Sequence, residues 1–360
     1  MTKNIESSVQ KNKQKVVVIC PGRGTYNKEE LGYFSKYHSD KLHILDTIDA
    51  HRAEQNQISI QALDSAPSYQ LKKHSAGENA SALIYACAIA DFAAIDQDKY
   101  EVSALIGNSM GWYITLAAAG VLSAENAIKL INTMGSLVSE KGGVSETTGQ
   151  LIYPIVNENW KIDNDKIDLL QNVLDEVSNI PECEAYLSIK LGGYWVLGAN
   201  KKGLAKLEKL LPKIDQRYPM KLFNHAAFHT PLLQGISKQA KAKLSQTLFK
   251  VPQCPIIDGR GHIWQPYSTD TDALYDYTLG HQVYDYYDFS RSVEVVLKEF
   301  SPDKLIVLGP GNTLGGAIGQ CLVEHKWQGI SSKSAFSKRQ KQDPFLLAMG
   351  NSEQRALVIK

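Results

Sequence analysis

The sequence predicts a mixed α/β fold in which a mainly parallel sheet is interrupted by a small ferredoxin-like unit. Short apolar strands alternate with apolar helices in the first 140 residues and again near residue 300. Between these parts, residues 145–224 follow the order strand, helix, strand, strand, helix, strand, which is the order of a ferredoxin-like unit. A chain of 360 residues is long enough to contain both parts and to bury a sizeable core.

Each predicted strand of the parallel sheet is a short apolar run that ends at a glycine or proline turn. The helices between these strands are apolar on one side or all round, which favours packing against the sheet. One of them begins after Ser123, a residue type that often caps the start of a helix. The other predicted elements of this part are strands at 16–20, 102–106 and 304–308, and helices at 79–95, 110–119, 231–248 and 290–300.

The middle of the chain contains short alternating strands and two amphipathic helices. Its predicted strands and helices are at 150–156, 163–177, 186–190, 194–197, 202–211 and 219–223. We therefore divide the chain into four parts. These are a disordered tail (1–14), a large catalytic α/β subdomain (15–144 and 225–330), a ferredoxin-like small subdomain (145–224) and a C-terminal extension (331–360).

Composition excludes several classes of protein. The formal net charge is +1 and no long basic run is present, which argues against nucleic-acid binding. Five cysteines lie far apart, so we expect free thiols and no metal site. The N-terminus lacks an apolar signal segment, and the apolar stretch 82–95 is too short to span a membrane and contains Asp91. We expect a cytoplasmic protein.

A serine lies between two glycines in the segment LIGNSMGW, residues 105–112. The pattern G-x-S-x-G is weak alone, but here it follows a predicted strand and opens a predicted helix. The glycines allow a sharp turn that exposes the hydroxyl of Ser109, and the first N–H groups of the helix face any oxyanion formed there. A serine that merely caps the helix is the alternative interpretation. We favour a catalytic nucleophile.

A serine nucleophile needs a base, and the chain contains nine histidines. His229 lies in the segment NHAAFHTPLL, directly before a predicted helix. An ordinary serine hydrolase, with the chain order Ser, Asp, His, is the competing interpretation. That order is filled by Asp258 or Asp270 with His262 or His281. Nothing in the neighbouring residues favours this second assignment.

Five segments, taken together, match one known family in order and in approximate spacing. GNSMGWYITLAAAGVLSAENA is similar to an active-site serine segment, and AAFHTPLL is similar to a histidine motif. ICPGRGTY, LGHQVYDYYDFSRSV and VLGPGNTLGG resemble a first-strand loop, a glutamine segment and a Gly-Pro-Gly segment. The family is that of the malonyl-CoA:acyl-carrier-protein transacylases, and the resemblance covers about residues 15–330. It implies an α/β-hydrolase-like large subdomain with a parallel sheet and an inserted ferredoxin-like small subdomain.

The resemblance also implies roles for individual residues. Ser109 would be the acylated nucleophile and His229 the base that activates it. The main-chain carbonyl of Gln282 would orient His229, and the backbone N–H groups of Arg23 and Met110 would form the oxyanion hole. The implied reaction moves an acyl group from acyl-CoA to the phosphopantetheine thiol of an acyl carrier protein, in fatty-acid or polyketide-type synthesis. No bound cofactor is implied.

The sequence departs from the family at the position that binds the acyl carboxylate. Malonyl-selective members carry an arginine twenty-five residues after the nucleophile, and here that residue is Met134. A thioether cannot balance a buried carboxylate, so we expect an uncharged acyl group, such as acetyl or a longer chain. A malonyl transferase that lacks this arginine remains an alternative.

Other substitutions predict a reshaped acyl pocket. Asn108 and Trp112 replace the family's usual histidine and glutamate, and we expect them to line the pocket with Met134 and Phe228. Ser81 stands where a glutamine is common. Arg23 also replaces a glutamine, and we expect a solvent-facing charge or a phosphate contact rather than a carboxylate partner.

A basic face on the second small-subdomain helix suggests where an acidic carrier protein would dock. It is formed by Lys201, Lys202, Lys206, Lys209 and Lys213. Such a run of charges is more often a solvated surface. Two further functions stay open: an acyl hydrolase that clears acyl groups from carrier proteins, and a degenerate family member that acts as a scaffold.

Overall fold

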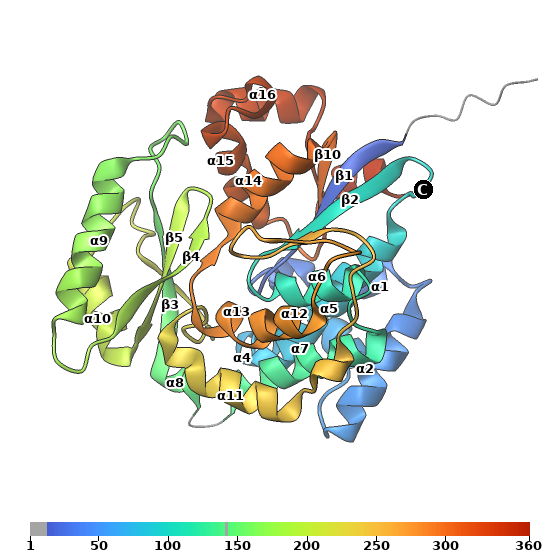
Figure 1. The fold of residues 1–360 in the computed structure, drawn as a ribbon, viewed down its shortest axis with the longest axis horizontal. Coiled ribbons are helices and arrows are strands. Elements are labelled where there is room, and N and C mark those ends of the chain that lie inside the picture. The colour runs from blue at the N-terminus through green and yellow to red at the C-terminus, as the bar shows by residue number, and fades with distance from the viewer. Residues whose placement is uncertain (1–12, 141–142) are drawn as a thin grey trace, which may run out of the picture.

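A six-stranded sheet forms the centre of the large part of the protein in the computed structural model, which describes residues 13–140 and 143–360 (Figure 1). The strand order is β11–β10–β1–β2–β7–β8, and every neighbouring pair is parallel except β7 and β8. This confirms the predicted α/β class with a mainly parallel sheet. The strands are β1 (Gln14–Cys20), β2 (Tyr100–Gly107), β7 (Ile256–Ile257), β8 (Ile263–Trp264), β10 (Lys304–Val307) and β11 (Leu346–Ala348). Residues 1–12 of the predicted tail lie outside the described residues.

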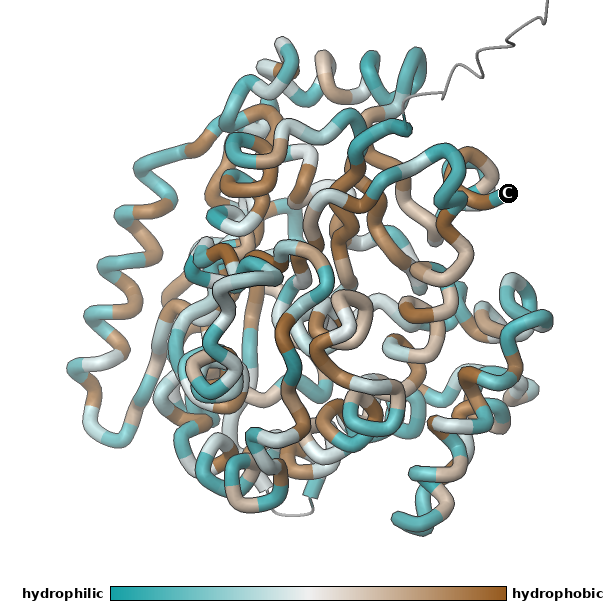
Figure 2. Tube along the Cα trace, turned by 45° about the vertical axis from the view of Figure 1, so that its right-hand side comes forward, coloured by the Kyte–Doolittle hydropathy of each residue, from teal (hydrophilic) through white to brown (hydrophobic). Residues whose placement is uncertain are grey.

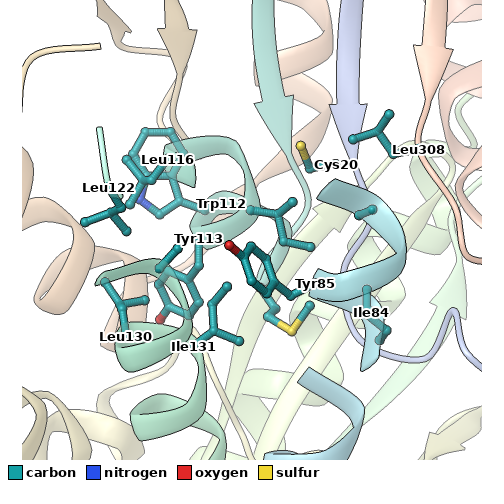
Figure 3. Close-up of a cluster of buried hydrophobic side chains, with 14 of the residues drawn as sticks. Cys20, Ile84, Tyr85, Trp112, Tyr113, Leu116, Leu122, Leu130, Ile131 and Leu308 are labelled. Atoms are coloured by element: carbon teal, nitrogen blue, oxygen red, sulfur yellow. The ribbon is translucent and has the colours of Figure 1, made fainter. Parts of the chain in front are cut away.

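Helices cover both faces of this sheet, because alternate residues of each strand point to opposite sides. In β1, Val16 and Val18 belong to the core shared with α5 (Gly77–Ala94), α6 (Gly111–Ala118) and α7 (Ala124–Ser139). Figure 3 shows side chains of this core, among them Tyr85, Tyr113 and Ile131. Val17 and Ile19 pack on the other side, against α14 (Phe289–Phe300) and α15 (Leu314–Glu324).

Several elements of the large part differ from the prediction. The expected helix at 231–248 is interrupted, with α11 (Gln234–Lys243) between two short 3-10 turns, because Leu244 adopts an extended conformation. The segment between residues 249 and 275, where no strand or helix was predicted, contains β7, β8 and the start of α12 (Thr271–Leu279). Four helices before α5 were not predicted, and three of them have only four or five residues. They are α1 (Tyr33–Tyr37), α2 (Leu42–Glu54), α3 (Ile60–Asp64) and α4 (Leu71–His74).

The small sheet has the predicted order of a ferredoxin-like unit. Its elements are β3 (Thr148–Pro154), α9 (Asn164–Ser178), β4 (Ala185–Leu191), β5 (Tyr194–Asn200), α10 (Lys201–Leu210) and β6 (Met220–Leu222). The spatial order is β6–β3–β5–β4–β9, and β9 (Tyr287–Asp288) adds a fifth strand, parallel to β4, from outside the predicted insertion. Helices α9 and α10 cover one face, where Leu151 and Leu197 are buried. The other face is turned toward the large part.

The C-terminal thirty residues are not a separate extension. Strand β11 pairs with β10 at the edge of the large sheet, and α16 (Lys333–Gln342) and α17 (Ser352–Val358) flank it. From α17, the buried Arg355 donates a hydrogen bond of 2.5 Å to the buried Asp91 on α5. The prediction failed here because the segment is mostly polar and its apolar strand is three residues long.

Hydropathy along the chain follows this architecture. Figure 2 shows hydrophobic segments concentrated in the central strands and the helices beside them, and hydrophilic segments along the outer turns. Among the helices of the described residues, none is both long and apolar enough to cross a membrane.

Candidate active site

The segment between β2 and α6 forms a sharp turn that presents Ser109. This serine has a φ of 55°, in the left-handed region that non-glycine residues rarely adopt. A Cβ atom at Gly107 would collide with the backbone of Gly111, and a Cβ atom at Gly111 would collide with the carbonyl of Cys20. The turn therefore requires both glycines of the G-x-S-x-G pattern.

His229 contacts Ser109, although 120 residues separate them in the chain. The distance from Ser109 Oγ to His229 Nε2 is 2.8 Å. His229 Nδ1 donates a hydrogen bond of 2.6 Å to the main-chain carbonyl of Gln282, on α13 (His281–Tyr284). Because Nδ1 carries the proton, Nε2 presents its lone pair to the serine hydroxyl. Ser109, His229 and Gln282, which were predicted separately, are thus brought together.

Burial determines the charge of His229. The pKa of His229 is lowered to about 4, mainly because the imidazole is removed from water; the hydrogen bond to Gln282 opposes this change, and the nearby His281 adds slightly to it. The imidazole is therefore neutral near pH 7. A neutral imidazole with a free Nε2 lone pair is the form that accepts a proton from a serine hydroxyl.

The side chain of Gln282 connects the serine turn to the histidine, a role that sequence analysis missed. Its Nε2 donates to the carbonyl of Ser109 at 3.1 Å, and its Oε1 accepts from the Tyr113 hydroxyl at 2.8 Å. Tyr113 and Gln282 are both buried. The position of Tyr113, one helical turn after Ser109, was the available sequence signal.

The alternative histidines do not contact Ser109. His281 pairs with Asp285 at 3.2 Å, and the side chain of His262 is exposed. Asp258 is buried, where it accepts hydrogen bonds from Arg260 and Trp264, and Asp270 caps the start of α12. The competing order Ser, Asp, His is therefore wrong for this fold.

Two hollows meet at Ser109. The first, which we call the inner cavity, has a volume of about 30 Å³. It is lined by Arg23, Ser81, Ser109, Met110, Tyr113, Ile131, Met134, Gly135, Val138, Phe228 and Gln282. The second, which we call the outer cleft, has a volume of about 310 Å³ and lies between the small sheet and the large part. Its walls include Ile152, Val196 and Met220 of the small sheet and Leu314 and Ala317 of α15.

The four residues predicted to line an acyl pocket separate in the structure. Met134 and Phe228 line the inner cavity. Asn108 lies on the outer cleft instead. Trp112 lines neither hollow, because its ring is fully buried in the core, where Nε1 donates to the Thr278 hydroxyl at 3.0 Å. The expectation that Trp112 shapes the pocket is wrong, since it lies on the side of α6 that packs against α12.

Arg23 is not the solvent-facing charge that the sequence suggested. Its Nη2 donates to the carbonyls of Ser75 and Asn224 at 2.9 and 2.8 Å, and its side chain lines both hollows. Burial lowers the pKa of Arg23 to about 10, so the guanidinium keeps its charge at neutral pH. The solvent-facing orientation was wrong because both carbonyls lie on segments far from Arg23 in the chain, whereas the alternative of a phosphate contact stays a prediction.

The predicted oxyanion donors also lie beside Ser109. Arg23 and Met110 both line the inner cavity, and Met110 directly precedes the first residue of α6. Within residues 13–140 and 143–360, neither of their backbone N–H groups donates to a protein acceptor. Their role as an oxyanion hole stays a prediction, supported by this position.

Metal-binding clusters are absent from the part of the chain that the structure describes. No three His, Cys, Asp or Glu side chains there are placed to hold a metal ion. All five cysteines are free thiols.

An α/β fold with a serine at a strand-to-helix turn, hydrogen-bonded to a histidine, is the arrangement of enzymes that form an acyl-serine. No family model matches the chain. It is 25% identical over 215 residues to the malonyl CoA-acyl carrier protein transacylase of Staphylococcus aureus (strain MRSA252), covering 59% of this chain and 64% of that protein. The protein of the same name from Salmonella typhimurium is 22% identical over 220 residues, covering 59% of this chain and 63% of that protein. The chain thus spans less than two thirds of the length of these relatives.

Solved structures share the fold over almost the whole chain. The malonyl-CoA:acyl carrier protein transacylase from Xanthomonas oryzae superimposes with a TM-score of 0.72 at 17% identity, over 97% of this chain and all of that one. A malonyl-transacylase in complex with a type II PKS acyl-carrier protein gives 0.70 at 16% identity, over 96% and 99% of the two chains. The chain therefore has the fold of these transacylases.

Proposed function

We propose that the protein is an acyltransferase that moves an acyl group from coenzyme A to an acyl carrier protein through an acyl-serine at Ser109. The observation that carries the proposal is the alignment of Ser109, His229 and the Gln282 carbonyl where the two hollows meet. The names of the relatives and of the structural neighbours support the same reaction class and both substrates.

In the first half-reaction, Ser109 Oγ attacks the thioester carbonyl carbon of acyl-CoA. His229 Nε2 takes the hydroxyl proton as the new C–O bond forms, and Gln282 holds the resulting imidazolium through Nδ1. The backbone N–H groups of Met110 and Arg23 would stabilise the oxyanion. When the C–S bond breaks, His229 returns the proton to the sulfur, so coenzyme A leaves as a neutral thiol.

In the second half-reaction, the phosphopantetheine thiol of the carrier protein enters through the outer cleft. His229 takes the thiol proton, the sulfur attacks the acyl-serine, and the proton then passes to Ser109 Oγ as its C–O bond breaks. Both steps exchange one ester or thioester for another. Transfer therefore requires that water reach the acyl-serine more slowly than the thiol does.

Size is the first criterion that the inner cavity sets for the acyl group. A volume of about 30 Å³ has room for about two water-sized groups, which suits an acyl chain of two or three carbons. The apolar lining by Ile131, Met134 and Val138 agrees with the expectation of an uncharged acyl group. The expectation of an uncharged acyl group also assumed that no cation lines the pocket. Arg23 lines the same cavity, so this assumption does not hold.

Intact-mass spectrometry tests the proposal. The protein is incubated with a mixture of short-chain acyl-CoAs and weighed, and a carrier protein bearing phosphopantetheine is then added. We expect a mass increase of one acyl group, absent in Ser109→Ala, which then passes to the carrier. An acyl-enzyme that loses its group to water before the carrier is added would favour the hydrolase instead. Absence of any acyl-enzyme would refute both functions.

A further inference from the structure

We propose that Arg23 selects the acyl group, by binding a carboxylate at the far end of the acyl chain attached to Ser109. This inference rests on the proposed acyl transfer and adds the substrate class. The acyl group would be short and would carry one terminal carboxylate, although the helix position at which the related family places its arginine holds Met134.

Arg23 reaches the inner cavity from a different element than the family's arginine does. Met134 lies on α7, whereas Arg23 lies in the loop after β1. Both side chains line the same cavity as Ser109, so a cation is present there although α7 supplies none. Two carbonyls, those of Ser75 and Asn224, hold the guanidinium in place through Nη2.

The guanidinium of Arg23 has N–H donors that the two carbonyls do not use. Its two Nη2 hydrogens are used by these carbonyls, which leaves three of the five N–H donors of an arginine. The Nε atom is buried and has no hydrogen-bond partner among the described residues. Buried donors are normally satisfied, so an unpartnered one beside a reactive serine points to a ligand that supplies the acceptor.

The charge of Arg23 forms no direct ion pair among the described residues. The Glu78 carboxylate lies near enough to favour the charged form of Arg23, and its buried Oε2 has no hydrogen-bond partner there either. His225 also lies close enough to be affected: its pKa falls to about 3, mainly because of burial and further because of the Arg23 charge. A neutral imidazole provides no compensation. Arg23 is half-buried, and a half-buried cation binds an anion more strongly than a fully exposed one does.

The remaining walls fit a short chain that ends in a carboxylate. Ile131, Met134 and Val138 are apolar and exclude water, while the Ser81 hydroxyl adds a further polar group. Ser109 and Arg23 line the same cavity, so a short acyl group on Ser109 would place its terminal carboxylate near Arg23. A phosphate of coenzyme A is the competing ligand for Arg23, because the side chain also lines the outer cleft.

The experiment compares malonyl-CoA with acetyl-CoA, which differ by this carboxylate. We measure kcat/KM for acylation of Ser109 with each substrate and take the malonyl-to-acetyl ratio, in which effects common to both cancel. The native enzyme should prefer malonyl-CoA. Arg23→Gln, which introduces the residue common in the family, should lower the ratio about 10- to 100-fold, as expected for loss of a charge-assisted hydrogen bond.

A second variant moves the guanidinium to the other position. Arg23→Gln combined with Met134→Arg should have a malonyl-to-acetyl ratio at least about tenfold higher than that of Arg23→Gln alone, since it restores a cation to the same cavity. Thermal unfolding of each variant shows whether it is folded.

Each contrary result has a distinct meaning. A native enzyme acylated by acetyl-CoA and not by malonyl-CoA would overturn the inference and leave acyl transfer intact. An equal loss with both substrates in Arg23→Gln would assign Arg23 to coenzyme A phosphate and also overturn it. Acylation by neither substrate, nor by any other acyl-CoA, would refute the proposed function itself.

Discussion

The two walls of the inner cavity differ in how completely their polar groups are bonded. On the catalytic wall, Ser109, His229 and Gln282 form a closed ring of hydrogen bonds, and Tyr113 donates a further one to Gln282. On the recognition wall, Arg23 keeps a buried donor, Nε, that has no hydrogen-bond partner in the described part of the chain. The difference indicates that the geometry of Ser109 and His229 exists without substrate. Under our proposal, a substrate carboxylate would complete the recognition wall.

Removing the base, His229, should have the largest effect on the rate of acylation. His229→Ala leaves the Ser109 proton without an acceptor, so acylation should slow by roughly 10³-fold or more. Stopped acylation reactions weighed by mass spectrometry measure this rate. His262→Ala is the matched control, because its side chain is exposed and lies away from both hollows. Equal losses in the two variants would contradict the assignment of His229.

The two walls also differ in what the sequence revealed. Ser109 was predictable because a strand, two glycines and a helix define its turn locally. Arg23 was not, because its orientation depends on the carbonyls of Ser75 and Asn224, which approach it only in the folded chain. Trp112 was misplaced for the same reason, since packing against α12 turns its ring into the core.

The strands of the large sheet also differ in how well the sequence predicted them. Strands β1 and β2 are apolar runs bounded by turn residues, and they were predicted close to their observed positions. Strand β11 has three residues within a polar segment, so no periodicity identifies it. It is stabilised by pairing with β10 and by the buried contact of Arg355 with Asp91, and both depend on tertiary structure.

Loss of the Tyr113 hydroxyl should weaken the catalytic wall without removing any reacting atom. Tyr113→Phe leaves Gln282 Oε1 without its donor, so the carbonyl that orients His229 is held less firmly. One neutral hydrogen bond contributes about 1 kcal/mol, so we expect kcat to fall roughly fivefold while KM changes little. Steady-state kinetics with a saturating carrier protein measure both constants.

Tyr153→Phe is the matched control for Tyr113→Phe. Its hydroxyl is also bonded, to the Pro212 carbonyl at 2.9 Å, but it lies in the core of the small subdomain. This variant should lose stability and keep kcat. If both variants lost stability alike and neither lost activity, Tyr113 would have no positioning role.

The comparison extends to the two faces of the small sheet. The exposed lysines of α10 lie on the side away from the outer cleft, because Leu204 and Leu207 of that helix pack on the opposite sheet face. Exposed Arg217 instead lines the cleft itself. An acidic carrier whose thiol must enter the cleft should therefore depend more on Arg217 than on these lysines.

Charge reversal separates these two faces. Arg217→Glu should raise the carrier's apparent KM about three- to tenfold, whereas Lys202→Glu with Lys206→Glu should change it less than about twofold. Both effects should shrink as salt is added, since exposed charges are screened. If the lysine pair had the larger effect on KM, the result would support carrier docking at the α10 lysines, as the sequence suggested.

Lowering the pH from 8 to about 5 should change the acylation rate least, because the burial of His229 keeps its imidazole neutral in this range. Burial depresses the pKa of His229 to about 4, so the acylation rate should be nearly constant from pH 8 to about pH 5 and fall tenfold per unit below about pH 4. At pH 5 about one tenth of such a histidine is protonated, against nearly all of one with an ordinary pKa near 6.5. A rate that halves near pH 6.5 would show that His229 is not buried in the working enzyme. Folding must be followed over the same range: an unfolded histidine binds a proton below about pH 6.5 that native His229 does not, so stability falls as pH drops from there toward 4.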